Sequence, residues 1–329
     1  MMPDVGLLYS HSRLSSFDNC PRAFRYRYVD KITVDVEGIE AFMGKLVHAV
    51  VEKLNLVTAA GKVPSLPSVL RRYELMWDET FDPDRIRIVR EGTEPDLYRA
   101  IGARCTENFY RRHYPFDLDE SVGIEEKVLV ALDPEGRYRL RGVIDRLVRT
   151  RAGGIEIHDY KTGQRVPSQT ILDRDRQLAL YQLAVRERFP DEPVSLVWHY
   201  LASDRVRTSE RSPEQLEALR RETIERIDAA ESETEYAPKT GPLCRWCEYN
   251  DRCEAGRRHL GLAPAEPAAD PPPAVADAPH EPAPARSARR EPPRTAPERE
   301  VARPEPEVAR PAPDRELPPA AASQLDLFS

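Results

Sequence analysis

The sequence lacks several features on which common functions depend. Its 329 residues contain no G-x-x-x-x-G-K phosphate loop, so the chain has no motor or nucleotide-hydrolysis signature of its own. There is no internal repeat, which excludes a repeat architecture. No stretch approaches the roughly 18 apolar residues of a membrane span, and the N-terminus offers only the short run Leu7-Leu8-Tyr9. We therefore expect a cytoplasmic protein with no membrane partner.

Cysteine is scarce, and its layout is unusual. Five cysteines, an odd number, argue for metal ligation by four of them rather than for a disulfide framework. Cys20 stands alone near the N-terminus, and the C-x2-C-x5-C group of Cys244, Cys247 and Cys253 follows more than two hundred residues later. Four thiolates can hold zinc or an iron–sulfur cluster, which would tie the two ends of a domain together. Cys105, in a helical stretch, is the expected spare.

Proline is concentrated in the last part of the chain. Residues 263–329 hold 17 of the 31 prolines, with Ala, Glu and Arg making up most of the rest, which is typical of disorder. They carry 8 basic and 12 acidic residues, which leaves −3 of the net charge of −7 on residues 1–262. Net charge therefore excludes no partner, and local basic patches matter more. We expect a globular domain over 1–262, a disordered Pro/Ala/Glu/Arg-rich linker over 263–323 and a short motif at 324–329.

The body of the chain has helices first, strands in the middle and a mixture after them. Helical periodicity covers Leu14–Tyr28, Ala41–Ala59, Val69–Thr80 and Tyr98–His113. Strand-like runs follow at Ser121–Leu132, Arg137–Thr150 and Ile155–Lys161. Helix, strand and helix follow at Ile171–Phe189, Val194–Ala202 and Pro213–Glu231. This order predicts an α/β or α+β domain around a mixed central sheet flanked by helices.

The strongest catalytic signal lies in two of the predicted strands. Side chains alternate faces along a strand, so Asp159 and Lys161 share one face with the apolar start of their strand. In the preceding strand Asp145 shares a face with Val143 and Leu147, where an isolated carboxylate would be costly. Two carboxylates and a lysine at a strand end fit a Mg²⁺ or Mn²⁺ site, in which the lysine orients or helps to deprotonate a water. A structural Asp–Lys salt bridge is the alternative.

Further polar residues repeat at helical spacing. Gly44, His48 and Glu52 line up at i, i+4 and i+8, and a glycine in mid-helix suggests close approach by another backbone or a ligand. A packed or solvated side chain is the alternative interpretation of His48. Gln177 and Tyr181 are one turn apart on the helix that follows the strands, close enough to face one cleft.

Together these residues resemble the RecB-type nuclease family of the PD-(D/E)xK superfamily. The matching motifs, in the family's order within about Leu8–Arg258, are Gly44-x-x-x-His48, Gly142-Val143-Ile144-Asp145, Asp159-Tyr160-Lys161-Thr162-Gly163 and Gln177-x-x-x-Tyr181. The resemblance implies a restriction-endonuclease-like core that hydrolyses DNA phosphodiester bonds, in single strands or from ends. It also implies residue roles: the metal ligands His48, Asp145, Asp159 and the Tyr160 carbonyl, the catalytic Lys161, and the supporting pair Gln177 and Tyr181.

A further carboxylate is expected near these residues. Glu126, at the start of the first predicted strand of the meander, could supply a carboxylate beside the metal or for a second metal. Its neighbour Glu125 points to the other face of a regular strand, and the sequence does not rank the two.

The cysteine layout is similar to the iron–sulfur branch of this family, which includes AddB-type helicase–nuclease subunits and CRISPR-associated RecB-like exonucleases. By that resemblance Cys20, Cys244, Cys247 and Cys253 hold a structural [4Fe–4S] cluster, and Zn²⁺ is the alternative. Trp246, inside the C-x2-C loop, is placed to shield such a cluster from solvent.

Two segments indicate partners. The run that contains Arg22, Arg25, Tyr26 and Arg27 alternates cations with aromatics, which suits the phosphates and exposed bases of a single strand, although a solvated helix face explains it equally. The end of the chain is similar to the pentapeptide with which bacterial polymerases and repair proteins bind the β sliding clamp, through Gln324, Leu325, Asp326, Leu327 and Phe328. A separate helicase is a further candidate partner.

Three functions follow from these patterns. The preferred one is a clamp-tethered, iron–sulfur RecB-like DNA exonuclease in bacterial repair, recombination or replication. A CRISPR-associated processing nuclease would use the same chemistry, but the clamp-like tail speaks against it. The third is a non-catalytic, zinc-stapled DNA-binding adaptor of the clamp, for which Asp145, Asp159 and Lys161 would be dispensable.

Overall fold

The computed structural model describes residues 7–264. The predicted linker, apart from its first two residues, and the terminal motif with Gln324 and Phe328 lie outside the described residues. No helix in the described part is long and apolar enough to cross a membrane.

A six-stranded mixed sheet carries the fold, in the order β1-β5-β6-β7-β8, with β4 paired to β5. Its strands are β1 (Leu7–Ser10), β4 (Glu120–Ala131), β5 (Tyr138–Arg149), β6 (Ile155–Lys161), β7 (Val194–Tyr200) and β8 (Arg205–Ser209). Two short strands, β2 (Glu37–Gly38) and β3 (Ile86–Arg87), pair in parallel as a separate ladder. Parallel and antiparallel pairs alternate across the sheet, so the predicted mixed sheet flanked by helices is confirmed.

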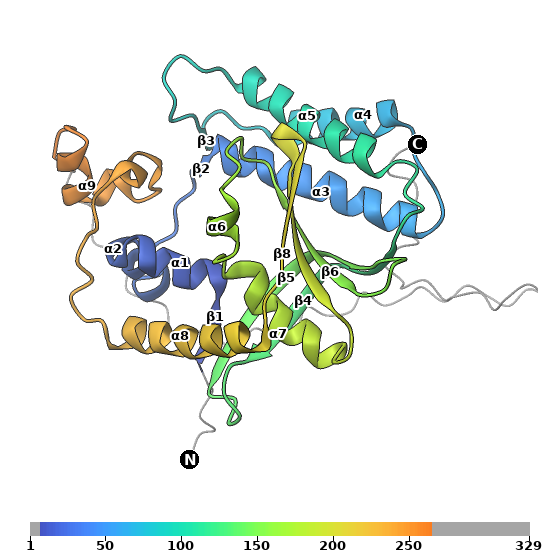
Figure 1. The fold of residues 1–329 in the computed structure, drawn as a ribbon. Helices are drawn as coiled ribbons and strands as arrows, with labels where there is room; N and C mark the ends of the chain where they lie inside the picture. Colours follow the sequence, from blue (N-terminus) through green and yellow to red (C-terminus); the bar gives the residue numbers. More distant parts are fainter. Residues whose placement is uncertain (1–6, 265–329) are drawn as a thin grey trace, which may run out of the picture. The chain divides into compact units, whose positions relative to one another are not determined.

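Helices cover both faces of this sheet (Figure 1). They are α1 (His11–Asn19), α2 (Pro21–Phe24), α3 (Ile39–Ala59), α4 (Leu66–Thr80), α5 (Pro95–His113), α6 (Gln169–Leu172), α7 (Gln177–Arg188), α8 (Pro213–Ser232) and α9 (Glu254–His259), with a π-helical turn at Arg25–Val29. Helix ends carry expected caps: the Ser10 and Ser65 hydroxyls accept backbone N–H groups at the starts of α1 and α4, and Ser212 with Gln215 forms a capping box at α8.

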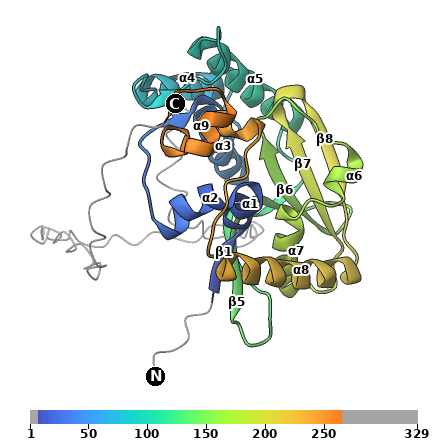
Figure 2. The same ribbon diagram turned by 90° about the vertical axis from the view of Figure 1, so that its left-hand side faces the viewer.

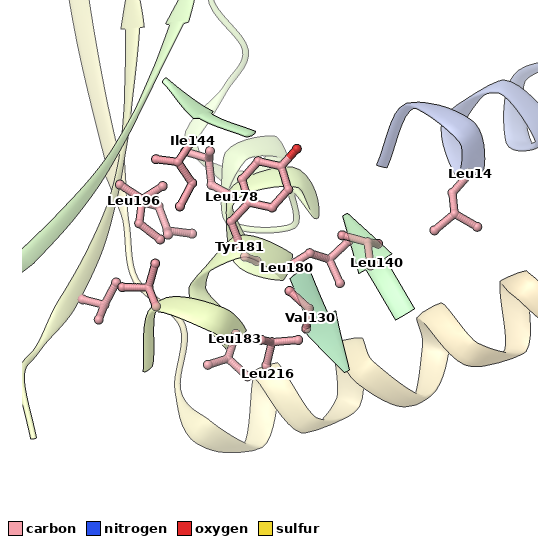
Figure 3. Close-up of a cluster of buried hydrophobic side chains, with 14 of the residues drawn as sticks. Leu14, Val130, Leu140, Ile144, Leu178, Leu180, Tyr181, Leu183, Leu196 and Leu216 are labelled. Carbon is pink, nitrogen blue, oxygen red and sulfur yellow. The ribbon is translucent and has the colours of Figure 1, made fainter. Parts of the chain in front are cut away.

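Two hydrophobic cores lie on the two faces of the sheet. The first packs α1, α7 and α8 against the sheet, and Figure 3 shows Tyr181 and Leu178 of α7 beside Ile144 of β5 and Leu196 of β7. The second joins α3, α4 and α5, and it includes Tyr160 of β6. The strand β6 therefore touches both cores, because Ile155 and Ile157 face the first and Tyr160 faces the second, as alternation predicts.

Several boundaries differ from the sequence-based expectation. The helix predicted over Leu14–Tyr28 breaks where Cys20 is extended, at φ −162° and ψ 107°, before Pro21, which cannot continue a preceding helix. The helix predicted over Ile171–Phe189 is two helices, and α7 begins where an Asp175 carboxylate oxygen accepts the backbone N–H of Gln177 at 3.0 Å. The strands β1 and β8 were not predicted, because runs of four and five residues carry little periodic signal.

Candidate active site

The candidate active site lies at a gap in the sheet beside β5. On one side of β5, β1 pairs in parallel with Tyr138–Arg141 and β6 pairs antiparallel with Arg146–Arg149. The strands β1 and β6 therefore run toward each other along the same edge of β5. Their pairing with β5 ends on either side of residues 142–145. Polar side chains at those ends converge because no further strand fills the gap.

Asp145 of β5 and the end of β6 form the centre of the site. An Asp145 carboxylate oxygen accepts the backbone N–H of Tyr160 at 2.8 Å. His48 Nε2 lies 2.7 Å from the carbonyl oxygen of Tyr160, and its Nδ1 lies 3.6 Å from an Asp145 carboxylate oxygen. Residues far apart in the sequence thus place an imidazole, a carboxylate and a carbonyl oxygen side by side.

Lys161 is held by two side chains. Its Nζ donates to Asp159 Oδ1 and to Gln177 Oε1, each at 3.0 Å. Burial alone would lower the pKa of Lys161, but the charge of Asp159 and their hydrogen bond raise it above the ordinary value. Lys161 is therefore a cation at neutral pH, which suits hydrogen-bond donation rather than proton abstraction.

Glu125 rather than Glu126 is the additional carboxylate at the site. His48, Glu125 and Asp145 have ligand atoms that all lie within 4.8 Å of one another, so within residues 7–264 these three side chains could hold a metal ion together. Glu125 lies between the register pairs that flank Asp145, so the two face each other across β4 and β5. Its φ of 48° marks a local irregularity in β4 at this residue. Glu126 instead pairs with Arg188 on the surface, at 2.7 Å.

The surroundings of Asp145 also differ from expectation. Ile144 and Leu147 both enter the first core, whereas Val143 is 40% exposed, so the side chains of β5 do not alternate regularly there. Asp145 consequently lies among polar groups rather than among apolar ones. This is the environment that a buried carboxylate needs.

The carboxylates of the site repel one another. Burial, and next the charge of Asp159, raises the pKa of Asp145 to about 6. Burial, and next the charges of Asp145 and Glu52, raises the pKa of Glu125 to about 7. A bound cation would relieve this repulsion, since opposite charge favours the ionised carboxylates.

Two glycines let other residues approach the site. A Cβ on Gly142 would lie 2.1 Å from a ring carbon of Tyr181, so only glycine leaves room for that buried ring beside β5. A Cβ on Gly44 would lie 3.2 Å from the hydroxyl oxygen of Thr162, which agrees with the close approach expected at this mid-helix glycine. Gln177 and Tyr181 therefore both support the site, one through Lys161 and one through packing.

Sequence reasoning missed His11. It is the first residue of α1 and follows the end of β1, so it projects from the opposite side of the gap to Lys161. Its Nε2 lies 3.2 Å from the Ser15 hydroxyl, burial lowers its pKa, and the charges that act on it include those of Lys161 and Asp159. Only the pairing of β1 with β5 reveals this position, and a four-residue strand gives no such signal in the sequence.

The four predicted cysteine ligands converge in a second site, formed by Cys20, Cys244, Cys247 and Cys253, which we call the cysteine site. All four border one cavity, and a Cβ on Gly256 would lie 3.4 Å from the Cys253 sulfur and 3.8 Å from that of Cys244. Cys105 is buried in α5, as expected of the spare. Figure 1 and Figure 2 both show α9 above α2, and the Lys239 N–H reaches the Cys20 sulfur, so segments far apart in the sequence contribute to this site.

Backbone N–H groups surround these thiols. Cys20, Cys244 and Cys253 each accept one at 3.4 Å, from Lys239, Gly241 and Gly256 respectively. Burial raises the pKa of Cys247, and a backbone hydrogen bond from Tyr249 opposes that effect. Such donors stabilise thiolates and are usual around ligated sulfur.

The predicted DNA-contacting residues are divided by the structure. Arg25 and Arg27 form ion pairs with Asp30 and Glu248, and Arg25 does not border the cavity. Arg22 donates to the Tyr236 carbonyl at 2.9 Å, and the Tyr26 ring lies against that of Tyr249 with centroids 5.4 Å apart; both border the cavity.

The fold is an α/β domain, and its carboxylate-rich site has side chains that could hold a metal ion. The model of the PD-(D/E)XK nuclease superfamily matches residues 9–254, so the chain belongs to that superfamily, whose members are generally nucleases that use divalent metal ions. Among solved structures, one titled "Crystal structure of SSO0001" is similar, with 15% identity over 78% of this chain and 89% of that one and a TM-score of 0.36. No curated protein matches the chain.

Proposed function

We propose that the protein is a metal-dependent deoxyribonuclease that hydrolyses phosphodiester bonds at the gap beside β5. The observation that carries this proposal is the convergence of Asp145, His48 and the Tyr160 carbonyl beside the Asp159–Lys161 pair. A structural salt bridge alone would not require an imidazole and a third carboxylate at the same place. Membership of the nuclease superfamily supports the same chemistry.

The residues present fit a divalent cation. His48, Asp145, Asp159 and the Tyr160 carbonyl would hold Mg²⁺ or Mn²⁺, since three of the four are oxygen donors of the kind hard cations prefer. Glu125 is a further donor that the structure adds to this set. The ion would supply activation of a water and stabilisation of charge on the phosphate.

The chain's own side chains orient the reactants. The cationic Lys161 donates hydrogen bonds to Asp159 and Gln177, which fix the position of its ammonium group. A phosphate oxygen or a water held beside Asp159 would also be within reach of this group. Fixed donors of this kind stabilise developing charge without reorganising during the reaction. His11, on the other side of the gap, is positioned to limit how the scissile strand enters.

The experiment is cleavage of end-labelled single-stranded and duplex DNA by anaerobically purified protein, with Mg²⁺ or Mn²⁺ and with chelator. We expect metal-dependent cleavage that is lost in Asp159→Ala and kept in Asp191→Ala, a substitution of an exposed loop aspartate. Release of terminal nucleotides rather than internal fragments would establish the exonuclease mode that we favour. Inactivity of the wild-type protein with intact DNA binding would instead favour the non-catalytic adaptor.

The cysteine site supports placement in the iron–sulfur branch of the RecB-type family. Thiolates are soft ligands that suit iron–sulfur clusters or zinc. The resemblance to the iron–sulfur branch favours [4Fe–4S] over Zn²⁺, which four thiolates would also suit. Iron and sulfide analysis of anaerobically purified protein distinguishes the two.

The clamp-like peptide Gln324–Phe328 extends the proposal to DNA repair or replication. The 61 residues of the linker would span on the order of 45 Å as a flexible coil, and a Pro-rich one would reach further. Tethering would convert a weak peptide contact into effective recruitment. Deletion of residues 324–329 should leave basal cleavage unchanged and remove stimulation by the β sliding clamp; loss of basal cleavage would contradict the modular arrangement.

A further inference from the structure

A cavity of about 1070 Å³ lies between the cysteine site and the active-site gap. It is bordered by α1, α2, the segment around β2, the first half of α3 and residues 238–256. Its lining includes the four cysteines and also His11 and Lys45, which is three residues before His48 on α3. The cavity therefore borders both the cysteine site and residues near the candidate active site.

Four cations that border this cavity carry charge that no carboxylate neutralises. Each side chain donates to a backbone carbonyl oxygen: Arg22 to Tyr236, Arg85 to Asp35, Arg87 to Cys247 and Lys239 to Asp18. Arg22 also hydrogen-bonds the Tyr26 side chain. Among the described residues, none of the four has a carboxylate oxygen within 4.0 Å. Two other lining cations, Lys45 and Arg27, form ion pairs with the lining acids Glu37 and Glu248. The lining also holds Asp35 and Glu40, so its six cations and four carboxylates leave an excess of two positive charges.

Exposed apolar side chains border the same cavity. Trp246 is 44% exposed and Leu243 is 62% exposed. The other two tryptophans, Trp77 and Trp198, are at most 3% exposed. An exposed tryptophan beside unneutralised cations is unusual on a soluble surface and indicates a ligand with planar and anionic parts.

We infer that this cavity binds a single strand of DNA and leads it to the active-site gap, with Trp246 stacking on a base and Arg22, Arg85, Arg87 and Lys239 contacting phosphates. The inference rests on the proposed function and deepens it, because it assigns the strand a route. Single-stranded DNA fits because its bases are free to stack on an aromatic ring, whereas bases inside a duplex are already stacked.

The test is binding rather than cleavage, so it does not depend on activity. Fluorescence anisotropy with labelled oligothymidylates of increasing length is measured on full-length, cluster-loaded Asp159→Ala protein. We expect Trp246→Ala to weaken binding by roughly 5- to 150-fold, the range found when one stacked base loses its aromatic partner. Trp246→Phe should restore most of the affinity, and Tyr114→Ala, which removes a 59%-exposed tyrosine beside a different cavity, should have no effect.

The salt dependence separates stacking from phosphate contacts. Arg85→Ala should reduce the slope of log Kd against log salt concentration by about 0.7, the value for one phosphate contact on a single strand, whereas Trp246→Ala should leave the slope unchanged. Arg221→Ala, on α8 and 65% exposed, is the matched control.

Each outcome has a defined meaning. Iron content equal to that of the parent shows that a variant has kept the cysteine site, so weaker binding is then a direct effect. Equal affinity of Trp246→Ala and its parent, or duplex binding as tight as single-strand binding, would overturn the inference. If Trp246 and Arg85 matter for binding but the wild-type protein cleaves no DNA, the strand route stands and the proposed nuclease function fails.

Discussion

The active-site gap and the cysteine site are built in opposite ways. The gap is formed by the ends of regular strands, and its carboxylates are crowded so that the pKa of Asp145 rises to about 6 and that of Glu125 to about 7. The cysteine site is formed by short turns at Pro242–Trp246 and Asn250–Arg252 together with Cys20, and its thiols accept backbone N–H groups. In the active-site gap, the sheet holds mutually repelling carboxylates close together. In the cysteine site, the cysteines lie on short segments with little regular secondary structure.

This difference in construction predicts that the gap residues serve the chemistry and that the cysteine site serves local stability. Residues at the gap are held by the sheet and both cores, so the fold does not need their charges. The segment that contains Cys244–Cys253 belongs to neither hydrophobic core in the described part of the chain, although Tyr249 and Asn250 are buried. On the proposal that the four cysteines bind a metal or cluster, ligation adds to the few contacts that hold this segment. We therefore expect substitutions at the gap to stop chemistry and those at the cysteine site to unfold a region.

The largest effect is expected from Asp145→Asn. Asparagine keeps an acceptor for the Tyr160 N–H but removes one charge from the metal-binding group, so the cleavage rate should fall on the order of 10³-fold. The melting temperature at pH 8 should not fall, because a repelled carboxylate is removed. Cleavage assays and thermal unfolding of the same sample check both parts, and a large loss of stability would show that the gap is structural.

Cys253→Ser should have the contrasting effect. Loss of one ligand should release the metal or cluster and remove several kcal/mol of local stability, since binding free energy is folding free energy in such sites. Limited proteolysis should then cut within residues 233–264, with reduced iron or zinc content. The matched control is Cys105→Ser, which should leave metal content unchanged; equal protease resistance of Cys253→Ser and wild type would contradict the division.

A smaller effect is expected from Gly142→Ala. The added methyl group would lie 2.1 Å from a ring carbon of Tyr181, and such overpacking costs about 1–3 kcal/mol. Gly163→Ala, in the same active-site region but with no neighbouring atom within 4 Å, should be close to neutral in stability. Denaturant unfolding measures both, and the cost should shrink in the Gly142→Ala/Tyr181→Ala double variant because the two sites are coupled.

The smallest effect is a pH-dependent stabilisation by metal. Raised pKa values mean that folding favours protonated Asp145 and Glu125, so their contribution to stability falls as pH rises from about 4 through 6 to 7. A fixed Mn²⁺ concentration of about ten times the Kd measured at pH 8 should therefore raise the melting temperature by a few degrees at pH 8. The same concentration should raise it by less at pH 5.5. Differential scanning fluorimetry checks this, and an equal shift at both pH values would place the ion elsewhere.

The residues that sequence reasoning located share a local cause. Asp159 and Lys161 follow from strand alternation over seven residues, and His48 follows from helical spacing from Gly44, so their relative faces need no tertiary information. The structure brings all of them together at the gap. The superfamily assignment from the same motifs is confirmed by the family match.

The residues that sequence reasoning did not place depend on pairing between distant segments. Glu125 faces Asp145 because the register of β4 on β5 sets the two residues opposite each other, and a single strand's sequence does not give that register. His11 reaches the gap only because a four-residue strand pairs with β5.

The most direct measurement of the central claim couples metal binding to cleavage in one sample. Mn²⁺ is titrated into wild-type and Asp145→Asn protein with electron paramagnetic resonance to count bound ions, and the same samples then receive a labelled single-stranded oligonucleotide. The account predicts that a bound ion and DNA cleavage are lost together in the variant. Cleavage that persists in Asp145→Asn, or unchanged Mn²⁺ binding in a variant that has lost cleavage, would contradict it.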